Sequence, residues 1–184
     1  QKSGDSSAVL GYMPDCDGDR GNIVYWNVKK NKAEILEAQE VFALSVLSEF
    51  AFTALKHKAF TKEAIEKLNM AVSVNDPTSM RIEALAKAFG ARVFRAEVGE
   101  ANVVNLAREK RSQGFLVPIL GEGSNGGNIT HPAAVRDPLN TIFALLKLLS
   151  LRGTENTPGL FKLWLMLSEQ EALYKDDFDF SDII

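Results

Sequence analysis

The alternation of short apolar segments with helical patterns in the middle of the chain constrains its fold most strongly. Apolar runs at 71–74, 92–98 and 115–120 predict strands, and helical patterns over 82–89 and 100–112 separate them. Only short loops join these segments. Strands that alternate with helices in this way form a parallel sheet with helices on both faces. We therefore predict an α/β domain with three layers, α/β/α, and a mainly parallel sheet.

Further elements are expected on both sides of this region. Apolar residues at three- and four-residue steps predict helices over 37–57, 138–151 and 159–174, and Thr61 is placed to cap a short helix that follows it. Near the start of the chain, the pattern predicts a polar lead and one strand within 1–13, a second strand over 22–28 and a turn at 29–32.

Composition narrows the classes of function that the chain can serve. The net charge of -3 gives no electrostatic reason to expect nucleic acid or an anionic membrane as a partner. No uninterrupted run of about 18 apolar residues predicts a membrane span, and no basic-then-apolar signal peptide begins the sequence. A single cysteine, Cys16, excludes an internal disulfide and fits a reducing compartment. At 184 residues, we expect a globular, cytoplasmic chain of one domain, or one domain with part of another.

An acidic run near the start carries the strongest indication of chemistry. Asp15, Asp17 and Asp19 alternate with small residues, and Arg20 follows directly. In a loop, such alternation can turn three carboxylates toward one point. Three hard oxygen ligands with coordination positions left open suit Mg²⁺ that holds a phosphate. Arg20 would then lie where it can pair with that phosphate or with a ligating carboxylate.

Other interpretations of this run depend on neighbouring positions. A solvated acidic turn is the simplest, because Asp and Gly are common turn residues. An EF-hand calcium loop needs Gly at its sixth position and Glu at its twelfth, where this chain has Arg20 and Trp26. An aspartyl-nucleophile phosphatase would have Thr or Ser two residues after its second Asp, and here that position is Asp19.

The fourth interpretation is a family resemblance. Residues 10–20, Leu-Gly-Tyr-Met-Pro-Asp-Cys-Asp-Gly-Asp-Arg, resemble the metal-binding loop of the phosphoglucomutase/phosphomannomutase (alpha-D-phosphohexomutase) family. Val98-Gly99 resembles the family's Thr/Val-Gly turn. The segment 121–124, Gly-Glu-Gly-Ser, resembles its sugar-binding Gly-Glu-x-Ser loop, and Arg136-Asp137 resembles its Arg/Lys-Asp-Gly segment. The four matches occur in the family's order and span most of residues 8–150.

The resemblance implies an enzyme that moves a phosphoryl group between the 1- and 6-positions of a hexose phosphate. Mg²⁺ would be the cofactor, and its ligands would be Asp15, Asp17 and Asp19. Arg20 would be a catalytic residue. The substrate-binding residues would be Gly99, Glu100, Glu122 and Ser124. Both substrate-binding segments follow predicted strands, and binding sites in such sheets lie beyond the carboxyl ends of the strands.

The resemblance also implies that this chain is part of a longer protein. The family's phosphoserine motif, Thr-Ala-Ser-His-Asn-Pro or a variant, does not occur in it, and neither does its C-terminal phosphate loop. We expect residues 1–20 to end a preceding domain and to carry the metal loop. Residues 21–175 would form the third, sugar-binding domain, and 176–184 a linker toward a missing C-terminal domain. The missing domains would be its partners, and the fragment alone would be inactive.

The sequence departs from the family pattern at three places. The segment 125–128, Asn-Gly-Gly-Asn, makes the sugar-binding loop one or two residues longer, and Glu100 stands where many relatives have a basic residue. The turn at 76–79 also lacks the lysine that many relatives carry. Two other classes of function stay open: a sugar-phosphate-binding module without chemistry, and an independent Mg²⁺-dependent phosphatase that uses Asp15.

Overall fold

The computed structural model describes residues 10–184. The protein is built around a four-stranded sheet in the order β5-β4-β6-β7. β4 (Met70–Asn75) pairs in parallel with β5 (Arg92–Ala96) and with β6 (Leu116–Glu122). β7 (Gly127–Thr130) pairs with β6 in the antiparallel direction. The predicted mainly parallel sheet is confirmed, and β7 adds an antiparallel edge that the sequence pattern did not indicate.

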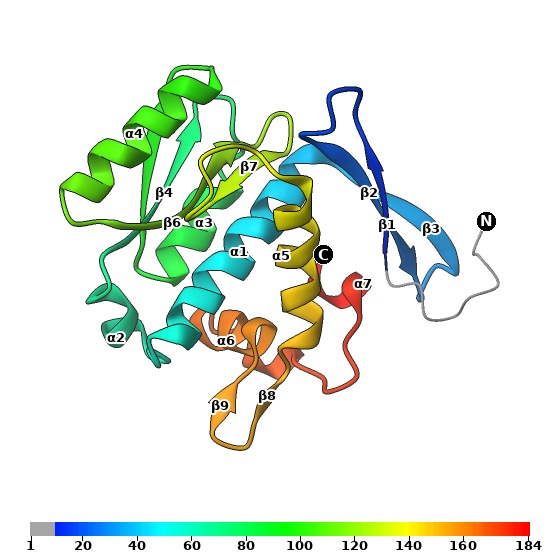
Figure 1. Cartoon of the computed structure of the whole chain (residues 1–184). Coiled ribbons are helices and arrows are strands. Elements are labelled where there is room, and N and C mark those ends of the chain that lie inside the picture. The colour runs from blue at the N-terminus through cyan, green and yellow to red at the C-terminus, as the bar shows by residue number, and fades with distance from the viewer. Residues whose placement is uncertain (1–9) are drawn as a thin grey trace.

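Helices cover both faces of this sheet (Figure 1). α4 (Glu100–Ser112) lies on one face, where its buried Val103 and Ala107 pack against residues of β4 and β6. On the opposite face, α1 (Ala38–Lys56) and α3 (Arg81–Ala88) pack against the sheet, and α5 (Pro138–Ser150) and α6 (Leu160–Leu167) pack against α1. All six residues of β4 are buried, as expected for a strand between two helical layers. The predicted three-layer α/β/α arrangement is therefore confirmed.

α1 is the central helix of the larger core (Figure 1). Its Phe50 ring meets Phe89 edge-on with centroids 5.6 Å apart, and Phe89 stacks on Trp164 of α6 at 6.1 Å. Full burial of such a side chain stabilises a fold by about 1.5–3 kcal/mol. By length and composition alone α1 could cross a membrane, but 67% of that stretch is buried inside the protein. Burial of this kind is usual for the central helix of a core.

A second, three-stranded antiparallel sheet lies beside the first (Figure 1). β1 (Leu10–Pro14) and β2 (Gly21–Asn27) form a hairpin, and β3 (Lys32–Leu36) pairs with the other edge of β2. The loop of residues 15–20 joins β1 to β2, so the domain boundary expected between residues 20 and 21 falls where this loop enters β2. The two predicted strands and the turn after them are present in residues 10–32, whereas β3 was not predicted. The predicted polar lead lies outside the described residues.

Smaller elements complete the described chain. α2 (Lys62–Glu66) begins at Thr61, whose side chain accepts a hydrogen bond from the Ala64 backbone N–H, as the capping prediction requires. β8 (Gly153–Thr154) and β9 (Thr157–Pro158) form a short hairpin. The helix predicted over 159–174 is shorter than expected: α6 ends at Leu167, Glu169 has a positive φ of 60°, and the 3₁₀ turn η1 (Glu171–Leu173) follows.

The C-terminal segment packs against the body of the domain. The sequence predicts a linker over residues 176–184, but Phe178 and Phe180 are buried in the larger core, and Phe180 begins α7 (Phe180–Ile183). The Phe178 ring lies 4.9 Å from Phe161, and the Phe180 ring lies 5.6 Å from Tyr25 of β2. The apolar surface of these two rings holds a segment that otherwise consists largely of acidic residues.

Candidate functional site

The four segments singled out in the sequence meet at one end of the four-stranded sheet. The aspartate loop (residues 15–20) is the turn of the β1–β2 hairpin, and Gly99 precedes α4. Glu122 ends β6, and Arg136 lies just before α5. Hydrogen bonds and ion pairs connect all four segments, although each comes from a different part of the chain.

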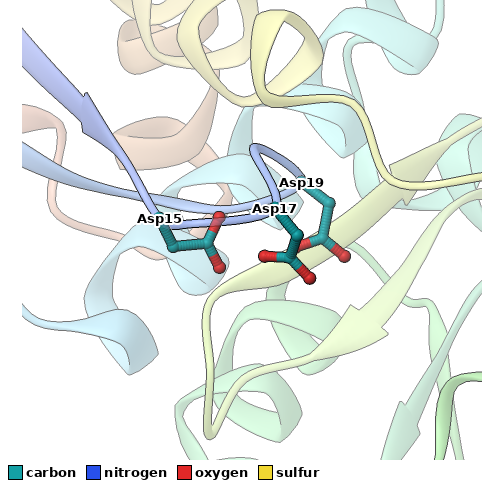
Figure 2. A group of neighbouring side chains, drawn as sticks. All are labelled: Asp15, Asp17 and Asp19. Atoms are coloured by element: carbon teal, nitrogen blue, oxygen red, sulfur yellow. The ribbon is translucent and has the colours of Figure 1, made fainter.

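The three aspartates of the loop converge. One carboxylate oxygen of each of Asp15, Asp17 and Asp19 lies within 4.8 Å of the others. Figure 2 shows the three side chains gathered on one side of the loop. The loop closes through a 2.9 Å hydrogen bond from the Asp15 backbone N–H to the Arg20 carbonyl oxygen. Cys16 is exposed.

Arg20 partly neutralises the aspartate loop. Its Nε lies 2.9 Å from Asp15 Oδ2 and 3.3 Å from Asp19 Oδ1. Desolvation opposes ionisation of Asp15, but hydrogen bonds from the Arg20 backbone N–H and at Asp17, together with the Arg20 charge, outweigh it and lower the pKa of Asp15. Asp15 is therefore ionised at neutral pH, which is the form that ligates a metal.

Tyr12 is a neighbour of this loop that the sequence reasoning missed. Its hydroxyl oxygen is buried and has no hydrogen-bond partner among residues 10–184. Burial, and then the charges of Asp15, Asp19 and Asp137, raise the pKa of the Tyr12 hydroxyl. The hydroxyl therefore stays protonated beside the carboxylates and keeps a donor to offer. An aromatic residue in a strand before an acidic loop gives no sequence signal that its hydroxyl will lie beside the carboxylates.

Glu122 accepts more hydrogen bonds than any other carboxylate described for the site. Only 5% of the residue is exposed. Its Oε1 accepts hydrogen bonds from Asn75 Nδ2 and the Gly99 backbone N–H, both at 3.1 Å. Its Oε2 accepts from Asn125 Nδ2 at 3.1 Å and from Arg136 Nη2 at closer range. These four donors occupy the positions that a carboxylate offers.

A polar network at the end of β4 supports the Glu122 loop. Asn75 is fully buried and also donates to Ser124 Oγ at 3.3 Å. Thr78 donates to Asn75 Oδ1 at 2.6 Å and accepts from the Gly123 backbone N–H at 3.0 Å. Sequence reasoning did not assign Asn75 or Thr78 to the site. The available signal was a polar residue that ends a buried strand at the binding edge.

Arg136 connects the aspartate loop with the sheet edge. Its Nη1 lies 3.1 Å from Asp19 Oδ2, its Nε lies 3.1 Å from Glu100 Oε2, and its Nη2 contacts Glu122 Oε2. A Cβ atom on Gly127 would lie only 2.6 Å from Arg136 Nε, so the missing side chain at Gly127 makes room for the guanidinium. The sequence motif had identified Arg136 as part of a resemblance, but not as a site residue.

The site carries more negative than positive charge. Five carboxylates share two guanidinium groups, which leaves a surplus of three negative charges among the paired and clustered groups. The carboxylates belong to Asp15, Asp17, Asp19, Glu100 and Glu122. Such a surplus is unfavourable unless a cation offsets it. A cavity of about 250 Å³ opens beside Asp15 and Arg20 and is also lined by Asn22 and Asn125.

Comparison with known proteins places the middle of the chain in a described family. Residues 51–162 match the family model for phosphoglucomutase/phosphomannomutase, alpha/beta/alpha domain III. This range contains Gly99, Glu122 and Arg136, whereas the aspartate loop lies before it. Comparison with curated proteins gave no significant match.

Three of the solved structures that match this chain are described as mutases. A protein described as a phosphomannomutase from Thermus thermophilus is 20% identical, with a TM-score of 0.46 over 89% of this chain and 31% of its own. An N-acetylglucosamine-phosphate mutase of the alpha-D-phosphohexomutase superfamily is 17% identical in its apo-form, with a TM-score of 0.45 over 95% of this chain and 33% of its own. The product complex of an N-acetylglucosamine-phosphate mutase is 18% identical, with a TM-score of 0.45 over 95% of this chain and 32% of its own. The chain thus spans about a third of the length of these structures.

Proposed function

Because the chain belongs to the phosphoglucomutase/phosphomannomutase family through its domain III, we propose that it supplies the metal loop and the sugar-binding edge of a phosphohexomutase. The family resemblance inferred from its sequence motifs is thereby confirmed. The proposed reaction moves a phosphoryl group between the 1- and 6-positions of a hexose phosphate. The observation that carries the proposal is the family match over residues 51–162, combined with the convergence of the four motifs at one edge of the sheet.

The aspartate loop fits Mg²⁺ by the chemistry of its donors. Asp15, Asp17 and Asp19 offer hard anionic oxygens that already lie within 4.8 Å of one another. Mg²⁺ prefers such ligands and retains open positions for water or phosphate oxygens. When bound, it would neutralise negative charge on a transferring phosphoryl group. The surplus of negative charge in the site supports this assignment.

Arg20 is proposed to pair with the phosphoryl group of the substrate. About a third of its side chain is exposed, so the guanidinium is reachable from solvent while it is held by Asp15 and Asp19. A guanidinium matches the geometry of phosphate oxygens and stays charged at any physiological pH. Its two carboxylate partners fix its position before substrate arrives, which favours electrostatic stabilisation of the transferring group.

The end of β6 and the turn before α4 are proposed to bind the sugar. Ser124 is exposed and keeps its hydroxyl hydrogen available for a sugar hydroxyl. Glu122 is buried and fully coordinated, so it would contact the sugar by exchanging a partner. The partner proposed to leave is Asn125, which is less buried than Asn75 and belongs to the same loop as Glu122. Gly99 and Glu100 line the other side of the same edge.

The chain itself lacks the family's phosphoserine motif, and we therefore propose that it has no mutase activity alone. The test has two parts. The purified chain is mixed with glucose 1-phosphate or mannose 1-phosphate, Mg²⁺ and the corresponding 1,6-bisphosphate, and conversion to the 6-phosphate is followed. In parallel, binding of each sugar phosphate is measured by calorimetry for the wild-type chain and for Ser124→Ala.

We expect no conversion, and sugar-phosphate binding that Ser124→Ala weakens by about three- to tenfold, since one hydrogen bond to a phosphorylated sugar is lost. Turnover by the chain alone would overturn the proposed dependence on a separate phosphoryl donor. Absence of any sugar-phosphate binding would contradict the assignment of the sheet edge. Release of phosphate from an aryl phosphate that is lost in Asp15→Asn would instead support an independent phosphatase.

A further inference from the structure

Arg136 is shared unequally between three carboxylates. Each of its three nitrogens has a different partner: Asp19, Glu100 and Glu122. These partners come from the aspartate loop, the start of α4 and the end of β6. One positive charge therefore pairs with three negative ones, and a change at any of the three contacts alters the other two.

The contacts of Arg136 with Asp19 and with Glu100, whose side chain is 38% exposed, are more easily exchanged than its contact with Glu122. The Glu122 side chain is 7% exposed, whereas the Asp19 side chain is 31% exposed. Separating a buried charge pair is costly because it leaves an uncompensated charge away from water. An ion pair nearer to solvent contributes less and is screened. Asp19 is also a carboxylate that the proposed function assigns to the metal.

We propose that Arg136 is a positioning residue that competes with the divalent cation for Asp19 and couples metal binding to the sugar-binding edge. This inference rests on the proposed function, because it takes the aspartate loop as the cation site. When the cation holds Asp19, the Arg136 guanidinium is left to Glu100 and Glu122. The same guanidinium thus links the state of the metal loop to the carboxylate that anchors Gly99.

Thermodynamic linkage gives the direction of the effect. If Arg136 and the cation compete for Asp19, each weakens the binding of the other by the same factor. Removal of the guanidinium should therefore increase the affinity of the loop for a divalent cation. Binding of the cation to the wild-type chain should also change the environment of Glu122, and hence the hydrogen bond that Glu122 accepts from the Gly99 backbone N–H.

The first experiment titrates Mn²⁺ into the wild-type chain and three variants by electron paramagnetic resonance, and repeats the titration with Mg²⁺ by calorimetry. Arg136→Gln removes the competing charge. Arg136→Lys keeps the charge but loses the three-way fork. Arg152→Gln is the matched control: Arg152 follows α5 as Arg136 precedes it, and it also donates several hydrogen bonds, to backbone carbonyls of Leu149, Asp176 and Phe178.

We expect Arg136→Gln to bind Mn²⁺ about three- to tenfold more tightly than the wild-type chain, which is the range for loss of one competing charged contact. The Mn²⁺ affinity of Arg136→Lys should lie between those of the wild type and Arg136→Gln. The affinity of Arg152→Gln should match the wild type, because Arg152 lies about one helix length, roughly 20 Å, from Arg136 and its charge is screened by salt. An Arg136→Gln chain with unchanged or weaker affinity would overturn the proposal.

The second experiment starts with the wild-type chain, so its main result does not depend on how a variant folds. Backbone amide resonances of the wild-type chain are recorded during the Mg²⁺ titration. The Gly99 amide should shift with the same saturation as the loop amides, while the Gly153 amide, in the β8–β9 hairpin, should not. In Arg136→Gln the Gly99 shift should fall to the background while the loop amides still respond. A Gly99 amide that ignores Mg²⁺ in the wild type would contradict the coupling.

The outcomes separate the two levels of inference. If all four chains bind the cation equally, the metal site of the proposed function stands and the role of Arg136 fails. If neither the wild type nor Arg136→Gln binds Mn²⁺ or Mg²⁺ at millimolar concentration, the metal site itself fails, and the competition fails with it. Binding by Arg136→Gln alone would be the strongest form of support.

Discussion

The backbone N–H of Gly99 donates a 3.1 Å hydrogen bond to Oε1 of Glu122, which joins the turn before α4 to the end of β6. Gly99 has φ of 127°, a conformation that residues with a Cβ rarely adopt. The amide that donates this hydrogen bond therefore belongs to a backbone conformation that favours glycine. Both residues belong to the edge of the sheet where the sugar is proposed to bind.

Gly99→Ala should therefore destabilise the chain by about 1–3 kcal/mol, the usual cost of a strained backbone position. Urea unfolding measures this difference. Gly114→Ala is the matched control, because Gly114 also has a positive φ, of 89°, but lies at the far end of α4. Both variants should lose stability, and only Gly99→Ala should weaken sugar-phosphate binding. Equal sugar-phosphate binding by both variants would contradict a role for the turn.

Asp17 tests the cation site without breaking an ion pair with Arg20 or Arg136. In the wild type, Mg²⁺ at about a hundred times its dissociation constant should raise the free energy of unfolding by about 2.7 kcal/mol. Asp17→Asn should lose most of this increase, because one of three converging ligands becomes neutral. Thermal unfolding with and without Mg²⁺ measures it. Asp177→Asn, at an exposed position near the C-terminus, should keep the full response.

Glu34 makes stability depend on pH in the β1–β3 sheet. The hydrogen bond from Lys30, and then those from Asn27 and Tyr25, lower the pKa of Glu34 to about 2. Because this value is below the ordinary 4.5, the carboxylate contributes its full stabilisation above pH 4.5 and loses it as the pH falls toward about 2. The urea midpoints of the wild type and Glu34→Gln should therefore differ most at about pH 6 and converge as the pH is lowered to about 3. A constant difference across this range would refute the assignment.

Phe50 tests the core that holds the two sheets in place. Phe50→Ala removes a fully buried ring that packs on Phe89, and it should cost about 3–5 kcal/mol in urea unfolding. Phe143→Ala removes the same side chain from α5, where it is 58% exposed, and should change stability by less than about 0.5 kcal/mol. A similar loss in both variants would mean that Phe143 is covered by another surface in solution.

Sequence patterns identified the elements whose periodicity is set by burial. β4 is apolar because both of its faces are covered, and α1 is apolar around much of its circumference because it lies between the sheet and two other helices. β3 and β7 were missed because neither shows a clear pattern of apolar residues: β3 is mostly exposed, and β7 is buried but short, with Gly127 and Asn128 at its start. Only Leu36 of β3 is buried, and β7 begins with Gly127, so pairing with a neighbouring strand rather than side-chain pattern makes each a strand.

The site was predictable as a set of motifs but not as a set of contacts. The motifs indicated Asp15, Asp17, Asp19 and Glu122, and the aspartate oxygens do converge in the structure. Arg136 could be assigned to the site only from the folded structure, because its partner Asp19 lies 117 residues away in the sequence. No local pattern specifies which of several carboxylates an arginine will meet.

That separation has a consequence for the order in which the protein folds. The aspartate loop belongs to a hairpin and can close on its own, because Asp15 and Arg20 are five residues apart. The pairing of Asp19 with Arg136 closes a much longer loop, whose entropy must be lost before the contact contributes. During synthesis the carboxylates therefore emerge long before the arginine that links them to the sheet. We therefore expect the nascent hairpin to be exposed to cellular cations before Arg136 has been synthesised.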